Sequence, residues 1–237
     1  MNRRQWIQAM AVLMLGATPT HAGQLRNTAL KRAARTVQNA FKPFYKIGGV
    51  LGFIVYEGAS NDDADAGFAI HDALAQMGKV NDDAFNALHP RRLTEAQFFG
   101  DWYDPSNSNL IWNGNVTTSD GRHLTRPTFK DLAGVKVASA GAGVPDIGQG
   151  GQFAYAFANP PYGLTGRRDH IQDVFNKVRQ TLLPPGHACI ITDWASPDLD
   201  QVSAYFAQGK EWWGIFLFTI RDTTTGRLTV ILGSTTD

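Results

Sequence analysis

The chain of 237 residues is 43% hydrophobic and 18% charged, proportions that exclude wholesale disorder and allow a sizeable core. Its single cysteine, Cys189, excludes an internal disulfide, a CxxC redox pair and a cysteine-based zinc cluster. The formal net charge of +1 at pH 7 is too small for the broad positive field of a nucleic-acid-binding protein, so nucleic acid is not an expected partner.

The first 22 residues have the layout of a bacterial export signal. Arg3 and Arg4 precede a short apolar run, Trp6–Ala17, and small residues lead to a cleavage position after Ala22. The run is too short to span a bilayer, which needs roughly 20 apolar residues. The arginine pair also resembles the twin-arginine signal. We therefore expect residues 1–22 to be a signal peptide and the mature protein to be periplasmic or secreted, by the general or the twin-arginine route.

Residues 23–97 are expected to form a mostly helical region with one apolar strand. The expected elements are a helix over Leu25–Phe41 ended by Pro43, a strand within Ile47–Tyr56, a helix over Asp65–Met77, and short helices over Asp82–Leu88 and Leu93–Phe99. The first helix is basic and the segment from Glu57 to Asp83 is acidic. They are interpreted as complementary surfaces of one fold, with contact to an anionic lipid or a partner as the alternative.

The composition changes near residue 98, where a second region, 98–237, is expected to begin. Asp101–Asn109 is turn-forming and aromatic, which indicates a surface loop. Asn113-Gly114 lies between Leu110–Trp112 and Val116–Thr118, a pattern that predicts a hairpin.

The last third predicts the order β-α-β-α-β-β with a terminal hairpin. Its elements are a strand over Gln152–Ala158, a helix over Asp169–Leu183, a strand over Cys189–Trp194, a helix started by Ser196-Pro197, and strands over Trp212–Ile220 and Leu228–Leu232. Trp212–Ile220 is apolar at nearly every position, which indicates a central strand covered on both faces. The fold class expected for the whole chain is α+β.

Asn159-Pro160-Pro161-Tyr162 resembles the catalytic tetrapeptide of the amino-methyltransferases that modify adenine or cytosine. The resemblance implies that Asn159 would hold the target amino group and that Tyr162 would stack on a flipped base, with S-adenosylmethionine as cofactor. The glycine-rich cofactor loop of that family has no counterpart, because only fifteen residues separate Gly143 from the tetrapeptide. The alternative is that the two prolines simply end the preceding element.

Four acidic residues lie beside aromatic ones, a combination typical of glycan and peptidoglycan sites. The candidate catalytic acids are Asp101, Asp104, Asp193 and Glu211, and their neighbours are Trp102, Tyr103, Trp194 and Trp212. The alternative is that the tryptophans pack the core while the acids cap turns. The candidate binding residues are Trp102, Tyr103, Trp112, Asn159 and Tyr162.

The sequence favours an exported protein that acts by binding, in an interaction, inhibitor or immunity-type role. Its partner would be a protein, a small molecule or a glycan. No metal site or cofactor is expected, since the six histidines show no HxH or HExxH spacing. A cell-envelope hydrolase that uses the acidic residues is the first alternative, and the amino-methyltransferase is the second.

Overall fold

The computed structural model describes residues 29–60, 62–105, 108–110, 116–117, 123–124, 153–207, 209 and 213–234. Of residues 101, 104, 116, 117, 123 and 124 it describes the backbone alone.

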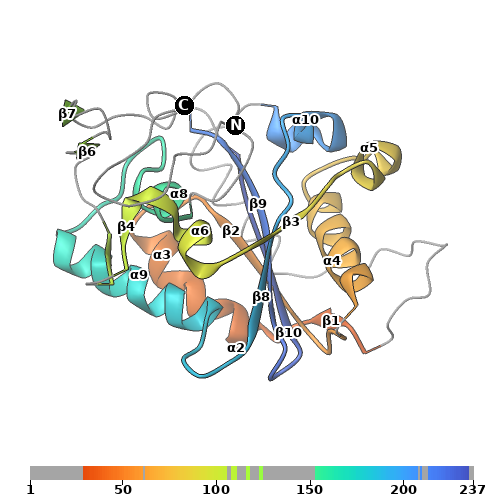
Figure 1. Ribbon diagram of the computed structural model, residues 1–237, viewed down its shortest axis with the longest axis horizontal. Coiled ribbons are helices and arrows are strands. Elements are labelled where there is room, and N and C mark those ends of the chain that lie inside the picture. Colours follow the sequence, from red (N-terminus) through yellow and green to blue (C-terminus); the bar gives the residue numbers. More distant parts are fainter. Residues whose placement is uncertain are drawn as a thin grey trace.

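A six-stranded antiparallel sheet forms the centre of the molecule (Figure 1). Its strands, in spatial order, are β1 (Lys31–Arg32), β2 (Gly52–Glu57), β10 (Arg227–Ser234), β9 (Ile215–Asp222), β8 (Cys189–Asp193) and β3 (Arg91–Leu93). Together with the helices on both faces, this sheet confirms the predicted α+β class. Strands from both sides of residue 98 belong to it, so the two predicted regions share one core.

The terminal hairpin of β9 and β10 was predicted and is the best-buried part of the sheet. All eight residues of β9 are buried, as are seven of the eight in β10. Thr229 pairs with Ile220, and β10 pairs on its other side with β2, where Ile54 lies opposite Val230. A strand with neighbours on both edges and layers on both faces must be apolar almost throughout, which explains the composition of these two segments.

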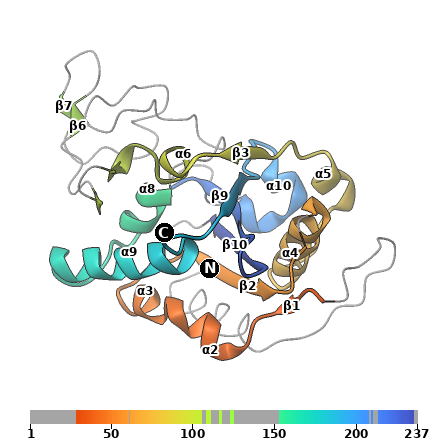
Figure 2. The ribbon, with the colours of Figure 1, turned by 60° about the horizontal axis from the view of Figure 1, so that its bottom comes forward.

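Helices cover both faces of the sheet (Figures 1 and 2). On one side lie α3 (Lys42–Lys46), α8 (Phe153–Ala158) and α9 (Arg168–Leu182). On the other lie α4 (Asp63–Ala75), α5 (Asp82–Asn86) and α10 (Leu199–Val202). The remaining short helices are α2 (Arg35–Gln38), η1 (Asn39–Phe41), α6 (Glu95–Phe99), η2 (Gly100–Trp102) and η3 (Ala204–Phe206). Four two-residue strands, β4 (Tyr103–Asp104), β5 (Asn109–Leu110), β6 (Val116–Thr117) and β7 (His123–Leu124), pair outside the main sheet.

Aromatic side chains fill the layer between the sheet and α8. The ring of Phe153 stacks on Phe98 of α6 with centroids 4.6 Å apart, and it also contacts Phe53 of β2 and Phe175 of α9. Phe157, one turn later on α8, lies 4.5 Å from Phe44. Trp102 of η2 contacts Tyr155 as well, so α8 is enclosed by aromatic rings from five other elements.

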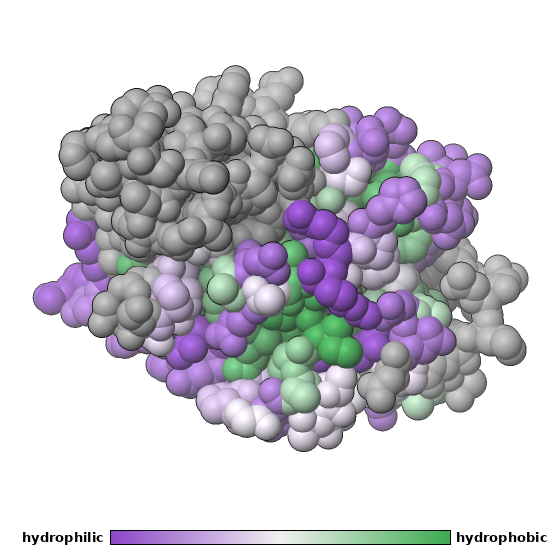
Figure 3. All heavy atoms as spheres, in the orientation of Figure 1, coloured by the Kyte–Doolittle hydropathy of each residue, from purple (hydrophilic) through white to green (hydrophobic). Residues whose placement is uncertain are grey.

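Strand β3 lies at one edge of the sheet and is short and basic. Among the described residues it pairs with Ile191–Asp193 of β8 alone, and Arg91 and Arg92 are exposed. In the described part of the chain, Cys189 and Ile190 have no strand partner on that side, and both are half-buried. In Figure 3, hydrophobic atoms lie beside strongly hydrophilic ones in the centre of the face that is shown. Short, charged edges of this kind discourage pairing with other chains.

Two predicted elements, the strand over Gln152–Ala158 and the helix over Leu25–Phe41 ended by Pro43, are wrong. Residues 153–158, expected as a strand, form α8, because a run that is apolar at nearly every position carries no period that separates strand from buried helix. Pro43 does not end a helix but occupies the second position of α3, where its missing N–H costs nothing. The helix expected over Leu25–Phe41 is divided, within its described residues, into β1, α2 and η1.

The region after residue 98 also differs from expectation. Trp102 and Tyr103 are only 2% and 5% exposed, so the prediction that they belong to a surface loop is wrong. Tyr103 packs between Phe99 and Phe175. The hairpin expected around Asn113-Gly114 lies outside the described residues at its turn, and its flanks pair elsewhere, β5 with β4 and β6 with β7.

Candidate functional site

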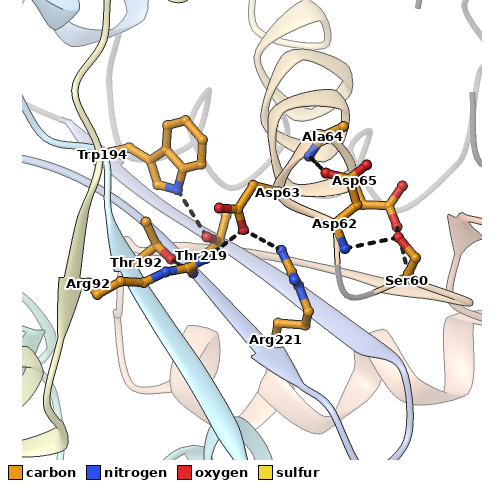
Figure 4. Close-up of polar contacts among 10 residues, drawn as sticks. All are labelled: Ser60, Asp62, Asp63, Ala64, Asp65, Arg92, Thr192, Trp194, Thr219 and Arg221. Carbon is orange, nitrogen blue, oxygen red and sulfur yellow. Dashed lines mark hydrogen bonds and ion pairs between the residues drawn. The ribbon is translucent and has the colours of Figure 1, made fainter. Parts of the chain in front are cut away.

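A row of polar side chains crosses one face of the sheet beneath the start of α4. The register places Arg92 of β3 opposite Thr192 of β8, and Thr192 opposite Thr219 of β9. Arg221 follows Thr219 by two positions and therefore points to the same face. Thr192, Thr219 and Arg221 are 5%, 2% and 2% exposed, in a layer where apolar residues are the rule. This row, together with Asp63 and Trp194, is called the arginine site below (Figure 4).

Asp63, the first residue of α4, connects the two arginines. Its Oδ1 accepts hydrogen bonds from Nη2 of Arg92 at 2.5 Å and from Nη2 of Arg221 at 3.0 Å. The other two acids of this helix start, Asp62 and Asp65, have local partners. Asp62 caps the helix by accepting from the N–H of Ala64, and Asp65 accepts from Ser60. In Figure 4 both lie on the side of the helix start away from Arg221.

Arg221 is enclosed but incompletely bonded. Its side chain is 3% exposed, whereas the Asp63 side chain is 66% exposed. Among the residues that the structure describes, Nε and Nη1 of Arg221 have no hydrogen-bond partner. These atoms carry three N–H groups, and a buried donor without an acceptor costs about 1–3 kcal/mol. A natural core rarely retains such a group without a reason.

The rest of the arginine site also supplies mainly hydrogen-bond donors. The hydroxyl of Thr192 accepts a bond from Nη1 of Arg92, and that of Thr219 accepts from Nε1 of Trp194 at 2.9 Å. Each hydroxyl keeps its own proton to donate. The Trp194 ring is stacked on Phe85 of α5, with centroids 6.2 Å apart and planes at 8°. The arginine site thus has more hydrogen-bond donors than acceptors, an arrangement that favours the binding of an anion.

The ionisation of Asp63 agrees with this view. Burial raises the pKa of the Asp63 carboxyl, but the hydrogen bonds from Arg92 and Arg221 outweigh that effect, and the pKa lies below its ordinary value. The carboxylate is therefore charged at neutral pH, and the site holds two positive groups and one negative group. The side chains of the arginine site are two arginines, two threonines, a tryptophan and one aspartate, and their hydrogen-bond donors are suited to binding an anion.

Asp193 is the candidate acid whose side chain the structure describes, and it is enclosed. The side chain is 0% exposed, accepts from Nη2 of Arg91 at 2.8 Å and from the N–H of Ala195 at 2.9 Å. Burial raises the pKa of Asp193 to about 6, and the bonds from Arg91 and Ala195 partly offset the rise. A raised pKa is typical of a general acid, but a carboxyl without solvent contact cannot reach a substrate.

The other candidates divide into three groups. The first group lies outside the described residues: the side chains of Asp101 and Asp104, and all of Glu211, Trp112 and Trp212. Trp102 and Tyr103 are buried in the core. Asn159 and Tyr162 are exposed, Tyr162 to 41%.

The Asn-Pro-Pro-Tyr segment forms the turn that leaves α8. The backbone N–H of Asn159 donates to the carbonyl of Tyr155, its side-chain amide donates to the same oxygen at 3.3 Å, and the N–H of Gly163 donates to the carbonyl of Pro160. Gly163 has φ +66°, which favours glycine. Asn159 therefore follows a helix, whereas the tetrapeptide of the amino-methyltransferases follows a strand.

No sequence pattern considered above predicted the arginine site. One signal was present: Arg221 ends the apolar run Trp212–Ile220, and a charge at the end of a doubly covered strand requires a partner. The partner could not be found by spacing, because Asp63 lies 158 positions earlier.

In the described part of the chain, no three His, Cys, Asp or Glu residues are grouped so as to hold a metal ion. A helix both long and apolar enough to cross a membrane is also not found among those residues. In comparisons with known proteins, no family model, curated protein or solved structure matched the chain. Function is therefore inferred from the geometry of the site.

Proposed function

We propose that this protein is an exported binding protein that holds a small anionic ligand at the arginine site. The observation that carries the proposal is the buried guanidinium of Arg221, which has a single hydrogen-bond partner in the described structure, and that partner is an exposed side chain. An anion that reached Nε or Nη1 would supply the missing acceptors and would gain charge-assisted hydrogen bonds.

A small molecule fits this site better than a protein surface. Arg221 is 3% exposed, so a flat interface could reach Arg92, which is 49% exposed, but not the buried guanidinium. Ligand sites for small molecules combine a few well-placed polar groups with aromatic ones. Thr192, Thr219 and Trp194 supply such groups here.

The hydrolase alternative requires two carboxylates facing one open cleft. Asp193 is fully enclosed, which does not support it as a member of such a pair. The methyltransferase alternative is not supported either, because Asn159 already uses its amide on the carbonyl of Tyr155 at the end of a helix.

Binding is tested by thermal unfolding of the mature chain in sodium chloride, acetate, succinate, sulfate and phosphate at matched ionic strength. We expect at least one anion to raise the midpoint above that in chloride, since a ligand that binds only the folded state stabilises it. The Arg221→Met variant should lose this response. The matched control is Arg167→Met, because Arg167 is 88% exposed and, among the described residues, forms its ion pair with Asp169. No anion-specific rise in the wild-type protein would overturn the proposal.

Export is tested separately by mass spectrometry of the protein from periplasmic and cytosolic fractions. A periplasmic species that begins at Gly23 is expected. A protein that retains Met1 and stays in the cytosol would contradict the proposed location.

A further inference from the structure

Asp63 binds both arginines through one of its two oxygens. Oδ1 accepts from Arg92 and from Arg221, and no described residue donates to Oδ2. A carboxylate that faces a guanidinium squarely forms two parallel hydrogen bonds, one from each nitrogen along an edge. Asp63 therefore uses only part of what Arg221 offers.

The unused part lies next to the used part. In a guanidinium group, Nε and Nη2 form one edge whose N–H groups point in the same direction. Asp63 occupies Nη2 at 3.0 Å, while Nε is buried without a partner in the described structure. A free carboxylate placed on this edge would gain the second hydrogen bond that Asp63 does not make.

Asp63 can leave without damage to its helix. Its side chain is 66% exposed, and water can solvate it once it turns outward. The cap of α4 depends on Asp62, which accepts from the N–H of Ala64 at 3.0 Å, and not on Asp63. The cost of displacement is thus mainly that of the hydrogen bonds from Arg92 and Arg221, and a ligand carboxylate on Arg221 would replace the second of these.

From these contacts we infer that the Asp63 carboxylate occupies the position of the ligand in the unbound protein. The ligand displaces Asp63 and presents its own carboxylate to the Nε–Nη2 edge of Arg221. This inference rests on the proposed function and names the chemical class of its ligand. Asp63 also sets the affinity, because every ligand must compete with a carboxylate that is tethered in place.

The test compares the binding of propionate to the wild-type protein and to Asp63→Asn by isothermal titration calorimetry. The variant removes the competing charge and is expected to bind propionate about tenfold more tightly, a change equivalent to about 1.4 kcal/mol. Asp62→Asn is the matched control. It removes an equal charge from the same turn, and asparagine caps helices as well as aspartate, so the affinity should change by less than about threefold.

The outcomes separate the two proposals. If Asp62→Asn raised the affinity for propionate as much as Asp63→Asn, the effect would be one of general charge and the inference would be overturned. Binding of propionate by the wild-type protein would in that case still preserve the proposed function. Absence of propionate and phosphate binding in both the wild-type protein and Asp63→Asn would overturn both. A larger gain for inorganic phosphate than for propionate would overturn the carboxylate assignment.

Discussion

Nη2 of Arg221 in β9 donates a hydrogen bond of 3.0 Å to Oδ1 of Asp63 at the start of α4, across 158 positions of sequence. The contact joins a buried cation to an exposed anion, which is an unequal pair. Arg221 loses most of its hydration and regains one hydrogen bond, so it is retained at a cost in stability. Residues held in this way are frequently functional rather than structural.

Replacing Arg221 by methionine should therefore leave the free energy of unfolding unchanged or raise it by about 1 kcal/mol. Methionine fills a similar volume and removes three buried N–H groups that lack acceptors, while Asp63 keeps its bond to Arg92. Urea unfolding measures the change. A loss of more than about 2 kcal/mol would mean that the arginine is needed for the fold.

Asp193 should make stability depend on pH between about 4 and 6. Its pKa is raised from 3.8 to about 6, so between these values the folded state holds a proton that the unfolded state has released. Stability from this group is therefore present below pH 3.8 and is lost as the pH rises through 6, by about 3 kcal/mol in total. The difference in the free energy of unfolding between wild type and Asp193→Asn, measured in urea from pH 4 to 7, should change with pH in this way. A difference that does not vary with pH would refute it.

Phe153 should be among the costliest residues to truncate. It is 0% exposed and contacts five other rings, those of Phe53, Phe98, Phe99, Phe157 and Phe175. We expect Phe153→Ala to lower the free energy of unfolding by about 3–5 kcal/mol through lost burial and a residual cavity. Phe153→Leu should cost clearly less. Equal losses in the two variants would argue against a cavity effect.

Asp222 should stabilise the turn between β9 and β10. Its side chain is 4% exposed and accepts from the N–H groups of Thr224 and Thr225, the hydroxyl of Thr225 and Nδ1 of His187. Asp222→Ala leaves these donors without their acceptor and should cost about 2–4 kcal/mol in chemical denaturation. Burial raises the pKa of Asp222, but bonds from Thr225 and His187 outweigh this, so the pKa is lowered. The stabilisation is therefore lost as the pH falls below the ordinary carboxyl range, and Asp222→Ala should lack that acid-side loss.

Local patterns were sufficient for several elements. The helical spacing of Ile171, Val174, Phe175 and Val178 predicted α9, and all four are buried as expected. The apolar runs at the end of the chain predicted β9 and β10 and the hairpin that joins them. These predictions succeeded because the signal, a hydrophobic period or a short turn, lies entirely within neighbouring residues.

Burial and pairing between distant segments were decided only in three dimensions. Aromatic rings from five other elements surround the helix Phe153–Ala158. Trp102 and Tyr103 are likewise buried by distant segments, although Asp101 and Asp104 beside them are polar. The arginine site depends on the register of β3, β8 and β9 and on the position of α4 above them. A one-residue slip of any of these strands would turn its member of the row to the opposite face. The sequence carries the α+β class and its most regular elements, because those follow from short-range periodicity. The site arises from the free energy of packing the whole chain, which no local pattern contains.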